Sequence, residues 1–366
     1  MQQRVTIADV AERVGVHKAT VSRALNKVTQ DQVSPATAKR IQRAARELGY
    51  VPNIVARGLR TSLSMTIGIV LPDLTNPLFP PIVRGVESYL SPRGYTALIV
   101  NTDGRDDKEA EAFHSLLERR VDGFLIATGQ VVHERVNEMY HRGIRAIMLN
   151  RGSSVPYPLV TGDDAAGVSA SVDHLVALGH KHIAHLAGPA NFTTTTVRSE
   201  AFTAAAQRHP GIRHGISPAP ALSVRAGETG MDQLLQRGGE LPTALIAGND
   251  LMAIGVLRSL RAHGLECPRD ISVIGFNDMP FAEDLNPPLT TVRVPHIKMG
   301  AAAARLLLEA INSGPQQPVT LTLPTSLIVR ESTAPPRDFD LTRGPSELGI
   351  VRSWPSTSAA PPLSGI

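Results

Sequence analysis

The chain has few of the residues that build disulfide frameworks, metal clusters and membrane spans. One cysteine, Cys267, occurs in 366 residues, which excludes an internal disulfide and a zinc site made of several cysteines. No stretch is long and apolar enough to cross a bilayer, and the first residues, MQQRVTIADV, carry no apolar segment of the secretory type. These absences predict a cytoplasmic protein without a membrane partner.

Several enzyme signatures are missing as well. The sequence contains no glycine-rich phosphate loop, no H-E-x-x-H and no G-x-S-x-G. The segment GHKHIAH contains three closely spaced histidines, His180, His182 and His185, so metal binding there is conceivable. These histidines flank a predicted strand, however, so structural packing is the preferred interpretation. We therefore predict no catalytic residues, no metal site and no cofactor.

Charge is distributed unevenly along the chain. Residues 1–60 hold eleven Lys and Arg against four Asp and Glu, a net charge of +7. Because the whole chain carries +4, the remaining 306 residues carry −3. A basic segment on a mildly acidic body favours a polyanionic partner for that segment, although a solvated basic surface would have the same composition.

The basic segment is predicted to form three short helices. The first helix begins after Thr6, whose hydroxyl can cap it, and ends at Gly15. The second runs from about His17 to Leu25, and the third follows Ser34 in SPATAKRIQRAARELGY. Each helix is too short to be stable alone, so we expect their apolar stripes to bury one another. The stripes are Ile7, Val10, Ala11 and Val14; Val21, Ala24 and Leu25; and Ile41, Ala44, Ala45 and Leu48.

This arrangement is typical of a helix-turn-helix module, which places its second helix in the major groove of DNA. Donors, hydroxyls and one small apolar residue occupy the exposed positions of that helix, and such side chains contact phosphates and base edges. An ordinary three-helix interaction domain is the alternative, and the charge argues against it. The exposed positions are His17, Lys18, Ala19, Thr20, Ser22, Arg23 and Asn26.

Residues 61–331 alternate predicted strands and helices, a pattern that favours parallel sheets with helices on both faces. The length fits two α/β subdomains, and ligands of such folds lie at the carboxyl ends of strands or between domains. Expected strands are 66–71, 95–100, 123–127, 145–150, 182–188, 243–248 and 271–276; expected helices include 80–90, 107–120, 165–179, 199–208 and 251–263. Residues 332–366 are rich in Pro, Ser and Gly, which predicts disorder.

Eight motifs follow one another along the chain: TIADVA, TVSRALN, GYVPNIVARGLRT, IGIVLPDLTNPLF, VDGFLI, LVALGHKHIAHLAGP, IAGNDLMAIGVLRSL and ISVIGFNDMPFAEDLNPPLTTVRVP. In these motifs and in their order, the chain from residue 5 to about 333 resembles the LacI/GalR family of transcription regulators. The resemblance implies a three-helix helix-turn-helix domain (1–51), a hinge helix and linker (52–62), and an α/β core of the periplasmic-binding-protein type (63–333). The core would consist of two Rossmann-like subdomains with parallel sheets. A disordered tail (334–366) lies outside the resemblance.

The resemblance also implies a homodimer that binds a pseudo-palindromic, double-stranded operator. Base contacts would come from Lys18, Ala19 and Arg23, whereas Thr6, Thr20, Ser22 and Asn26 would mainly hold phosphates. His17 stands where the family usually has a Ser or Thr cap, which calls the cap into question and makes a phosphate contact the expected role. In the hinge, the DNA-contacting residues would be Asn53, Arg57 and Leu59, the last as a minor-groove wedge.

In the family, small effectors bind between the two α/β subdomains. The matching positions here are Leu78, Phe79, Thr194, Arg198, Arg225, Asn249 and Asn277, and Asp163 is a further candidate. Asp163 could equally cap the helix after it, and Phe79 could be a core residue. Arg225 replaces a frequent aromatic and Asn277 a frequent Asp, so a cation is gained and a carboxylate lost. Together with Arg198 these changes favour a negatively charged ligand, and a solvated Arg225 is the equally open alternative. We therefore expect a sugar acid or another small organic acid, with a neutral sugar as runner-up, and an effector-controlled repressor; a periplasmic-type solute receptor is the alternative function.

Overall fold

The computed structural model describes residues 5–25, 29–50, 63–314 and 317–336. The chain divides into two compact units, Met1–Ser64 and Met65–Ile366. The proposed hinge helix and most of the proposed tail lie outside the described residues, as do Asn26, Asn53, Arg57 and Leu59. The domain boundaries given above therefore stay predictions. None of the described helices combines the length and apolarity that a membrane span requires.

The first unit contains the three predicted helices. They are α1 (Ile7–Val14), α2 (Lys18–Leu25) and α3 (Pro35–Glu47), with a 3-10 turn at Gln30–Gln32 between α2 and α3. Gly15 ends α1 in the left-handed region at φ 72°, where a residue without Cβ has no steric cost. Ser34 caps α3 by accepting the Thr37 N–H, and Pro35 occupies the first helical position, as predicted.

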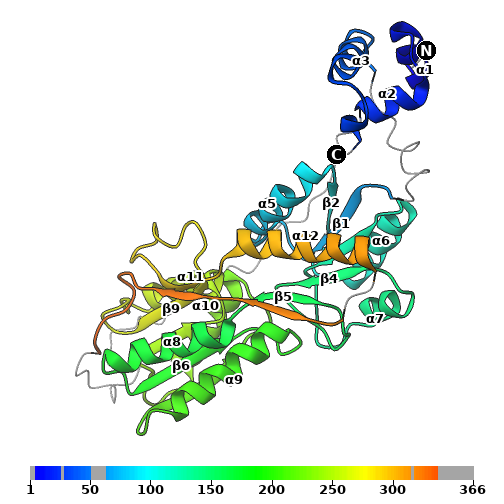
Figure 1. The fold of residues 1–366 in the computed structure, drawn as a ribbon. Coiled ribbons are helices and arrows are strands. Elements are labelled where there is room, and N and C mark those ends of the chain that lie inside the picture. The colour runs from blue at the N-terminus through cyan, green and yellow to red at the C-terminus, as the bar shows by residue number, and fades with distance from the viewer. Residues whose placement is uncertain (1–4, 26–28, 51–62, 315–316, 337–366) are drawn as a thin grey trace, which may run out of the picture. The chain divides into compact units, whose positions relative to one another are not determined.

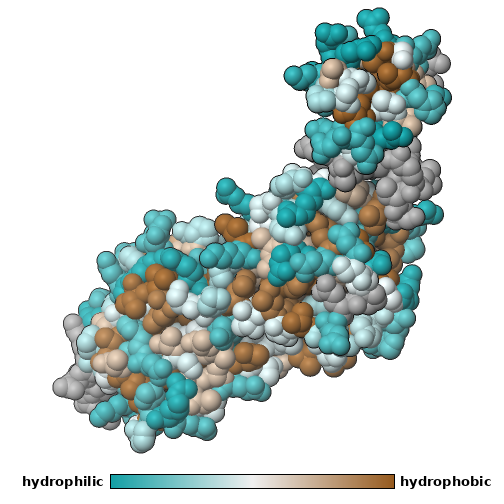
Figure 2. All heavy atoms as spheres, viewed as in Figure 1, coloured by the Kyte–Doolittle hydropathy of each residue, from teal (hydrophilic) through white to brown (hydrophobic). Residues whose placement is uncertain are grey.

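The predicted stripes form the core of this unit. All their residues are buried except Ile7, Leu25 and Leu48, which are partly buried and pack against the others. Ile41 has no exposed surface and lies among residues of all three helices. A hydrogen bond also links α3 to the end of α1, because the Arg40 guanidinium donates to the Val14 carbonyl (3.0 Å). Hydrophilic side chains cover much of the outer surface of α1–α3 in the view of Figure 2.

The second unit contains two six-stranded sheets (Figure 1). The first has the order β11-β5-β4-β3-β1-β2 and the second β12-β10-β9-β8-β6-β7. The two lobes share one strand order, and all pairings are parallel except that of β10 with β12, whose counterpart β5 with β11 is parallel. The first sheet comprises β1 (Thr66–Leu71), β2 (Thr96–Asn101), β3 (Gly123–Ile126), β4 (Ala146–Leu149), β5 (Leu159–Gly162) and β11 (Thr320–Leu323). The second comprises β6 (His182–Ala187), β7 (Arg213–Pro218), β8 (Ala244–Ala247), β9 (Ser272–Asn277), β10 (Thr290–Arg293) and β12 (Ser326–Ile328).

Helices flank both sheets, and the closest helix pairs are α5 with α12, α8 with α9, and α10 with α11. The first lobe has α5 (Phe79–Leu90), the 3-10 turn Ser91–Arg93, α6 (Asp106–Glu118), α7 (Glu134–His141) and α12 (His296–Ser313); the second has α8 (Asp164–Ala177), α9 (Thr193–Gln207), α10 (Val224–Gln236) and α11 (Asp250–Ala262). Glycines allow the backbones of α5 and α12 to meet. A Cβ on Gly300 would lie 2.0 Å from the Ile82 carbonyl oxygen.

Two differences from the sequence expectations concern the start of α9 and five of the strands. Helix α9 begins at Thr193, six residues before the predicted start, so Thr194 lies in its first turn and not in a preceding loop. Strands β5, β7, β10, β11 and β12 were not predicted. Strand β7 reads RHGISP and is mostly exposed, because it is an edge strand that pairs with β6 alone among the described strands. Neither an apolar run nor a clear alternation marks it.

Candidate DNA-binding surface and effector cleft

The start of helix α2 shows how His17 is used. Its Nδ1 accepts the N–H of Ala19 (3.2 Å), and its carbonyl accepts those of Thr20 and Val21. The imidazole therefore caps the helix in the way that a Ser or Thr would. His17 thus provides the cap that its identity had called into question, because an imidazole nitrogen without a proton is also a hydrogen-bond acceptor.

The predicted base readers lie together on one short helix. Lys18 and Arg23 are exposed, whereas Ala19, Thr20 and Ser22 are half-buried. Thr6 is exposed at the start of α1, but its hydroxyl donates to the Asp9 carboxylate (2.9 Å), which also accepts the Thr6 N–H (2.7 Å). These two hydrogen bonds lower the pKa of Asp9, the backbone bond most. Thr6 and Asp9 thus form a capping box at the start of α1, in which the Thr6 side chain faces the Asp9 N–H and the Asp9 carboxylate accepts the Thr6 N–H.

In the second unit, Arg198 is held by three contacts within its own lobe. Its Nε donates to Asp164 (2.8 Å), its Nη1 donates to the Gly248 carbonyl (2.6 Å), and its Cζ lies 3.7 Å from the Phe276 ring centroid. Arg198 is 6% exposed and Asp164 is equally buried. Burial raises the pKa of Asp164, and the neighbouring guanidinium offsets part of that shift. The Arg198 charge is therefore compensated, which weakens its contribution to anion binding.

Two further predicted cleft residues serve as helix caps. Asn249 accepts the Met252 N–H (2.8 Å) and donates to the Leu222 carbonyl (3.2 Å), so both ends of its amide hold the start of α11. Asp163 accepts the Ala166 N–H (3.0 Å) at the start of α8. The capping role that sequence reasoning left open for Asp163 is therefore present in the structure.

The other predicted cleft residues differ in burial. Leu78, Phe79, Thr194 and Asn277 are buried, and Asn277, at the carboxyl end of β9, has φ +117° and no side-chain hydrogen bond among the described residues. Arg225 is exposed in the first turn of α10. The structure thus gives Arg225 the solvated position that the sequence left equally open, and it does not bring Arg225 to Arg198.

Arg151 was missed by sequence reasoning, although it is the more unusual arginine. It follows β4, is 7% exposed, and its Cζ lies 3.7 Å from the centroid of Phe192 in the other lobe. It makes no ion pair with any described carboxylate. Burial first, and then the like charge of Arg198, lower its pKa to about 10. Arg151 is therefore still a cation at neutral pH, and it is close enough to Arg198 for their charges to repel.

The segments around Arg151 connect the two lobes directly. The Gly152 N–H donates to the Thr193 hydroxyl (3.0 Å), and the Val131 N–H donates to the Asn191 carbonyl (2.9 Å). The Asn191 side chain also donates to Gln130 (3.2 Å). Loops at the carboxyl ends of β3 and β4 thus meet the loop after β6, which is where ligands of parallel α/β folds are held.

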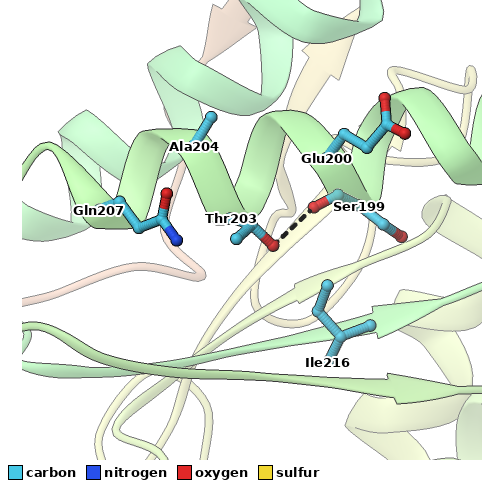
Figure 3. A pocket seen from close by; sticks show the side chains of 6 residues that line it. All are labelled: Ser199, Glu200, Thr203, Ala204, Gln207 and Ile216. Atoms are coloured by element: carbon cyan, nitrogen blue, oxygen red, sulfur yellow. Dashed lines mark hydrogen bonds between the residues drawn. The ribbon is translucent and has the colours of Figure 1, made fainter.

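A groove of about 390 Å³ lies elsewhere, between the outer side of α9 and strand β7 (Figure 3). None of the predicted effector residues lines it. Its walls are Ser199, Glu200, Thr203, Ala204, Gln207 and Ile216, and the Thr203 hydroxyl is already bonded to the Ser199 carbonyl (3.0 Å). Glu200 is the one charged residue of this lining, so the lining offers no cation to an anionic effector.

The histidines of GHKHIAH pack into the second lobe. His180 bonds to the Thr243 hydroxyl and the Ala334 carbonyl (both 2.9 Å), and His185 Nδ1 donates to the Ile246 carbonyl (2.9 Å). Burial lowers the pKa of His185 to about 4, and it does the same at His296, where the Arg198 charge adds to the effect. Both imidazoles are therefore neutral in the folded protein at neutral pH.

The fold and these sites define a class of protein, namely a two-lobed α/β ligand-binding core preceded by a helix-turn-helix unit. Comparisons with known proteins agree. Residues 6–53 match the family of bacterial regulatory proteins of lacI type, and residues 172–333 match the periplasmic binding protein-like domain. A ribose operon repressor of Halalkalibacterium halodurans is 32% identical over 90% of this chain and 97% of its own length.

Solved structures give the same result. A Lac repressor dimer bound to operator and an anti-inducer is 28% identical, with a TM-score of 0.76 over 91% of this chain and 100% of that one. A regulator from Enterococcus faecium with bound ribose is 32% identical, with a TM-score of 0.65 over 74% of this chain and 100% of that one. The chain belongs to the LacI family: it is a DNA-binding transcriptional regulator and not an enzyme.

Proposed function

We propose that the protein is a repressor that binds a pseudo-palindromic operator as a homodimer and is controlled by a small effector held between its two lobes. The cationic α2 surface with its capped start carries the DNA-binding part of this proposal. Support for the quaternary arrangement comes from the related Lac repressor, which is a dimer on its operator. We place this activity in the cytoplasm, where a bacterial operator is found.

On DNA, Lys18, Ala19 and Arg23 read base edges, and Thr6, Thr20 and Ser22 hold phosphates. His17 acts through its cap on α2. A guanidinium can make two hydrogen bonds to a guanine, which contributes roughly 1–3 kcal/mol of discrimination. Contacts from Asn26, Asn53, Arg57 and the Leu59 wedge remain predictions, because these residues lie outside the described parts of the chain.

The effector that we propose is a sugar acid or another small carboxylate, and a neutral sugar is the alternative. Ribose in the cited Enterococcus regulator favours the alternative. The buried, unpaired Arg151 favours the acid. Arg225, which the sequence offered as part of an anion site, gives less support because it is exposed.

The function is tested by selecting duplexes from a random pool with the full chain. We expect inverted repeats whose half-sites lie about one or two helical turns apart, with affinity that falls steeply as salt increases. The variant Arg23→Gln should lose one preferred base pair in each half-site, while Arg258→Gln on α11, outside the helix-turn-helix unit, serves as the charge-matched control. Selection of no common sequence, or of single half-sites only, would contradict the proposal.

A further inference from the structure

We propose that Arg151 is the residue that selects an effector by its negative charge, and that Arg225 has no part in this selection. The inference rests on the proposed function, because it concerns the same cleft between the lobes. It begins from the burial of Arg151, which is 7% exposed. Such a cation normally has a carboxylate partner.

The surroundings of Arg151 supply a flat surface but no counter-charge. The Phe192 ring stacks on one side of the guanidinium at 3.7 Å. No described residue accepts a hydrogen bond from its side-chain nitrogens, and no described carboxylate pairs with it. The guanidinium is planar and presents its donors in a fork that matches a carboxylate. A bound carboxylate would therefore meet both requirements of this side chain, charge and hydrogen bonding.

The neighbouring positions reinforce the same conclusion. Asn150, directly before Arg151, and Asn277 occupy the ends of β4 and β9, which are equivalent strands of the two lobes. Both are in the region of positive φ, at +67° and +117°. Both carry amides, which provide no negative charge. Asp164, a buried carboxylate at the start of α8, is paired with Arg198 at 2.8 Å. Arg151 thus keeps an uncompensated positive charge at the place where segments of the two lobes meet.

The position of Arg151 also ties anion binding to the contact between lobes. Phe192 is the residue before α9, and the Gly152 N–H next to Arg151 donates to the first residue of that helix, Thr193. An anion on the guanidinium consequently sits between segments of both lobes and near the positive end of α9. It would favour the arrangement in which these segments touch.

The test is thermal unfolding of the full chain with matched pairs of ligands at equal ionic strength. The probes are D-gluconate, D-glucuronate, D-galacturonate, acetate and inorganic phosphate, set against D-glucose, D-galactose and D-ribose. Wild type should be stabilised by at least one anion, with a rise of several degrees at about 100 times its Kd, and not by the matching neutral sugar. Arg151→Gln should lose this shift, and Arg225→Gln, which removes an exposed cation, should keep it.

A second variant separates a loss of anion binding from a folding defect in Arg151→Gln. Asn150→Asp leaves Arg151 in place and tolerates a positive φ, but it supplies a neighbouring carboxylate. We expect it to lower the affinity for the anion at least tenfold while the unliganded protein melts close to wild type. An anion shift that survives in Arg151→Gln, or a wild type stabilised by no anion, overturns the inference.

The two proposals fail in different ways. If neutral sugars alone stabilise wild type and change operator binding, the assignment of Arg151 is wrong and the repressor function stands. If the selected DNA binds identically with every ligand that stabilises the protein, effector control itself is wrong.

Discussion

The three-helix unit should be much more sensitive to a single core truncation than the α/β unit. Ile41 has no exposed surface and packs against residues from α1 and α2. Truncation of a buried Ile to Ala costs about 2–5 kcal/mol. At roughly 0.05–0.15 kcal/mol per residue, the described residues of this unit have a total stability of only about 2–7 kcal/mol. We therefore expect Ile41→Ala to unfold this unit, whereas Ile41→Val, which costs about 1 kcal/mol, leaves it folded.

Two assays on the full chain check this expectation. Trypsin should cut Ile41→Ala within α3, after Lys39, Arg40 and Arg43, and should leave wild type and Ile41→Val intact there. Operator binding should fall by at least a hundredfold in Ile41→Ala, while the unfolding transition of the α/β unit stays where it is. Protection of α3 in Ile41→Ala, together with operator affinity within threefold of wild type, would refute the reasoning.

Three further predictions concern the helix cap, the buried histidines and the α5–α12 contact. His17→Ala should destabilise the first unit by about 1 kcal/mol in a urea titration, and His17→Ser should restore most of this loss. His185 and His296 have folded pKa values of about 4. Their contribution to the free energy of unfolding is complete above their unfolded pKa near 6.5, and it is lost as the pH falls towards 4. Each histidine should account for about 3 kcal/mol of that loss, and His296→Gln should therefore flatten the pH dependence of unfolding. Gly300→Ala should lower the melting temperature sharply, because its Cβ would lie 2.0 Å from the Ile82 carbonyl oxygen.

Local signals in the sequence predicted the DNA-binding unit well. Its stripes follow the helical period, and Ser34, Pro35 and Gly15 mark helix ends by their own chemistry. The seven predicted strands are also present, to within a residue or two, because buried parallel strands read as continuous apolar runs. These features depend on neighbouring residues along the chain, so one sequence is sufficient to predict them.

The features that were missed depend on residues distant in sequence. The start of α9 has Phe192 as its cap and a run of threonines after it, so no polar cap or helix-forming residue marks it; Thr193 is instead bonded to Gly152. Arg198 was recognised, but its partner Asp164, 34 residues away, was not. Arg151 was missed because its burial and its contact with Phe192 exist only once the lobes are assembled. The fold brings the two residues of each pair together, and no pattern of neighbouring residues in the sequence predicts these contacts.

The contacts between the lobes are weak enough for an effector to control them. Around Arg151 they consist of three hydrogen bonds and one cation–π contact. At about 1 kcal/mol net for each of these, separating the segments costs about 4 kcal/mol. A ligand must favour one arrangement by about 5.5 kcal/mol to move a two-state equilibrium from 1:99 to 99:1. The two values are similar, so an anion that contacts both lobes could shift this equilibrium without breaking the core of either sheet.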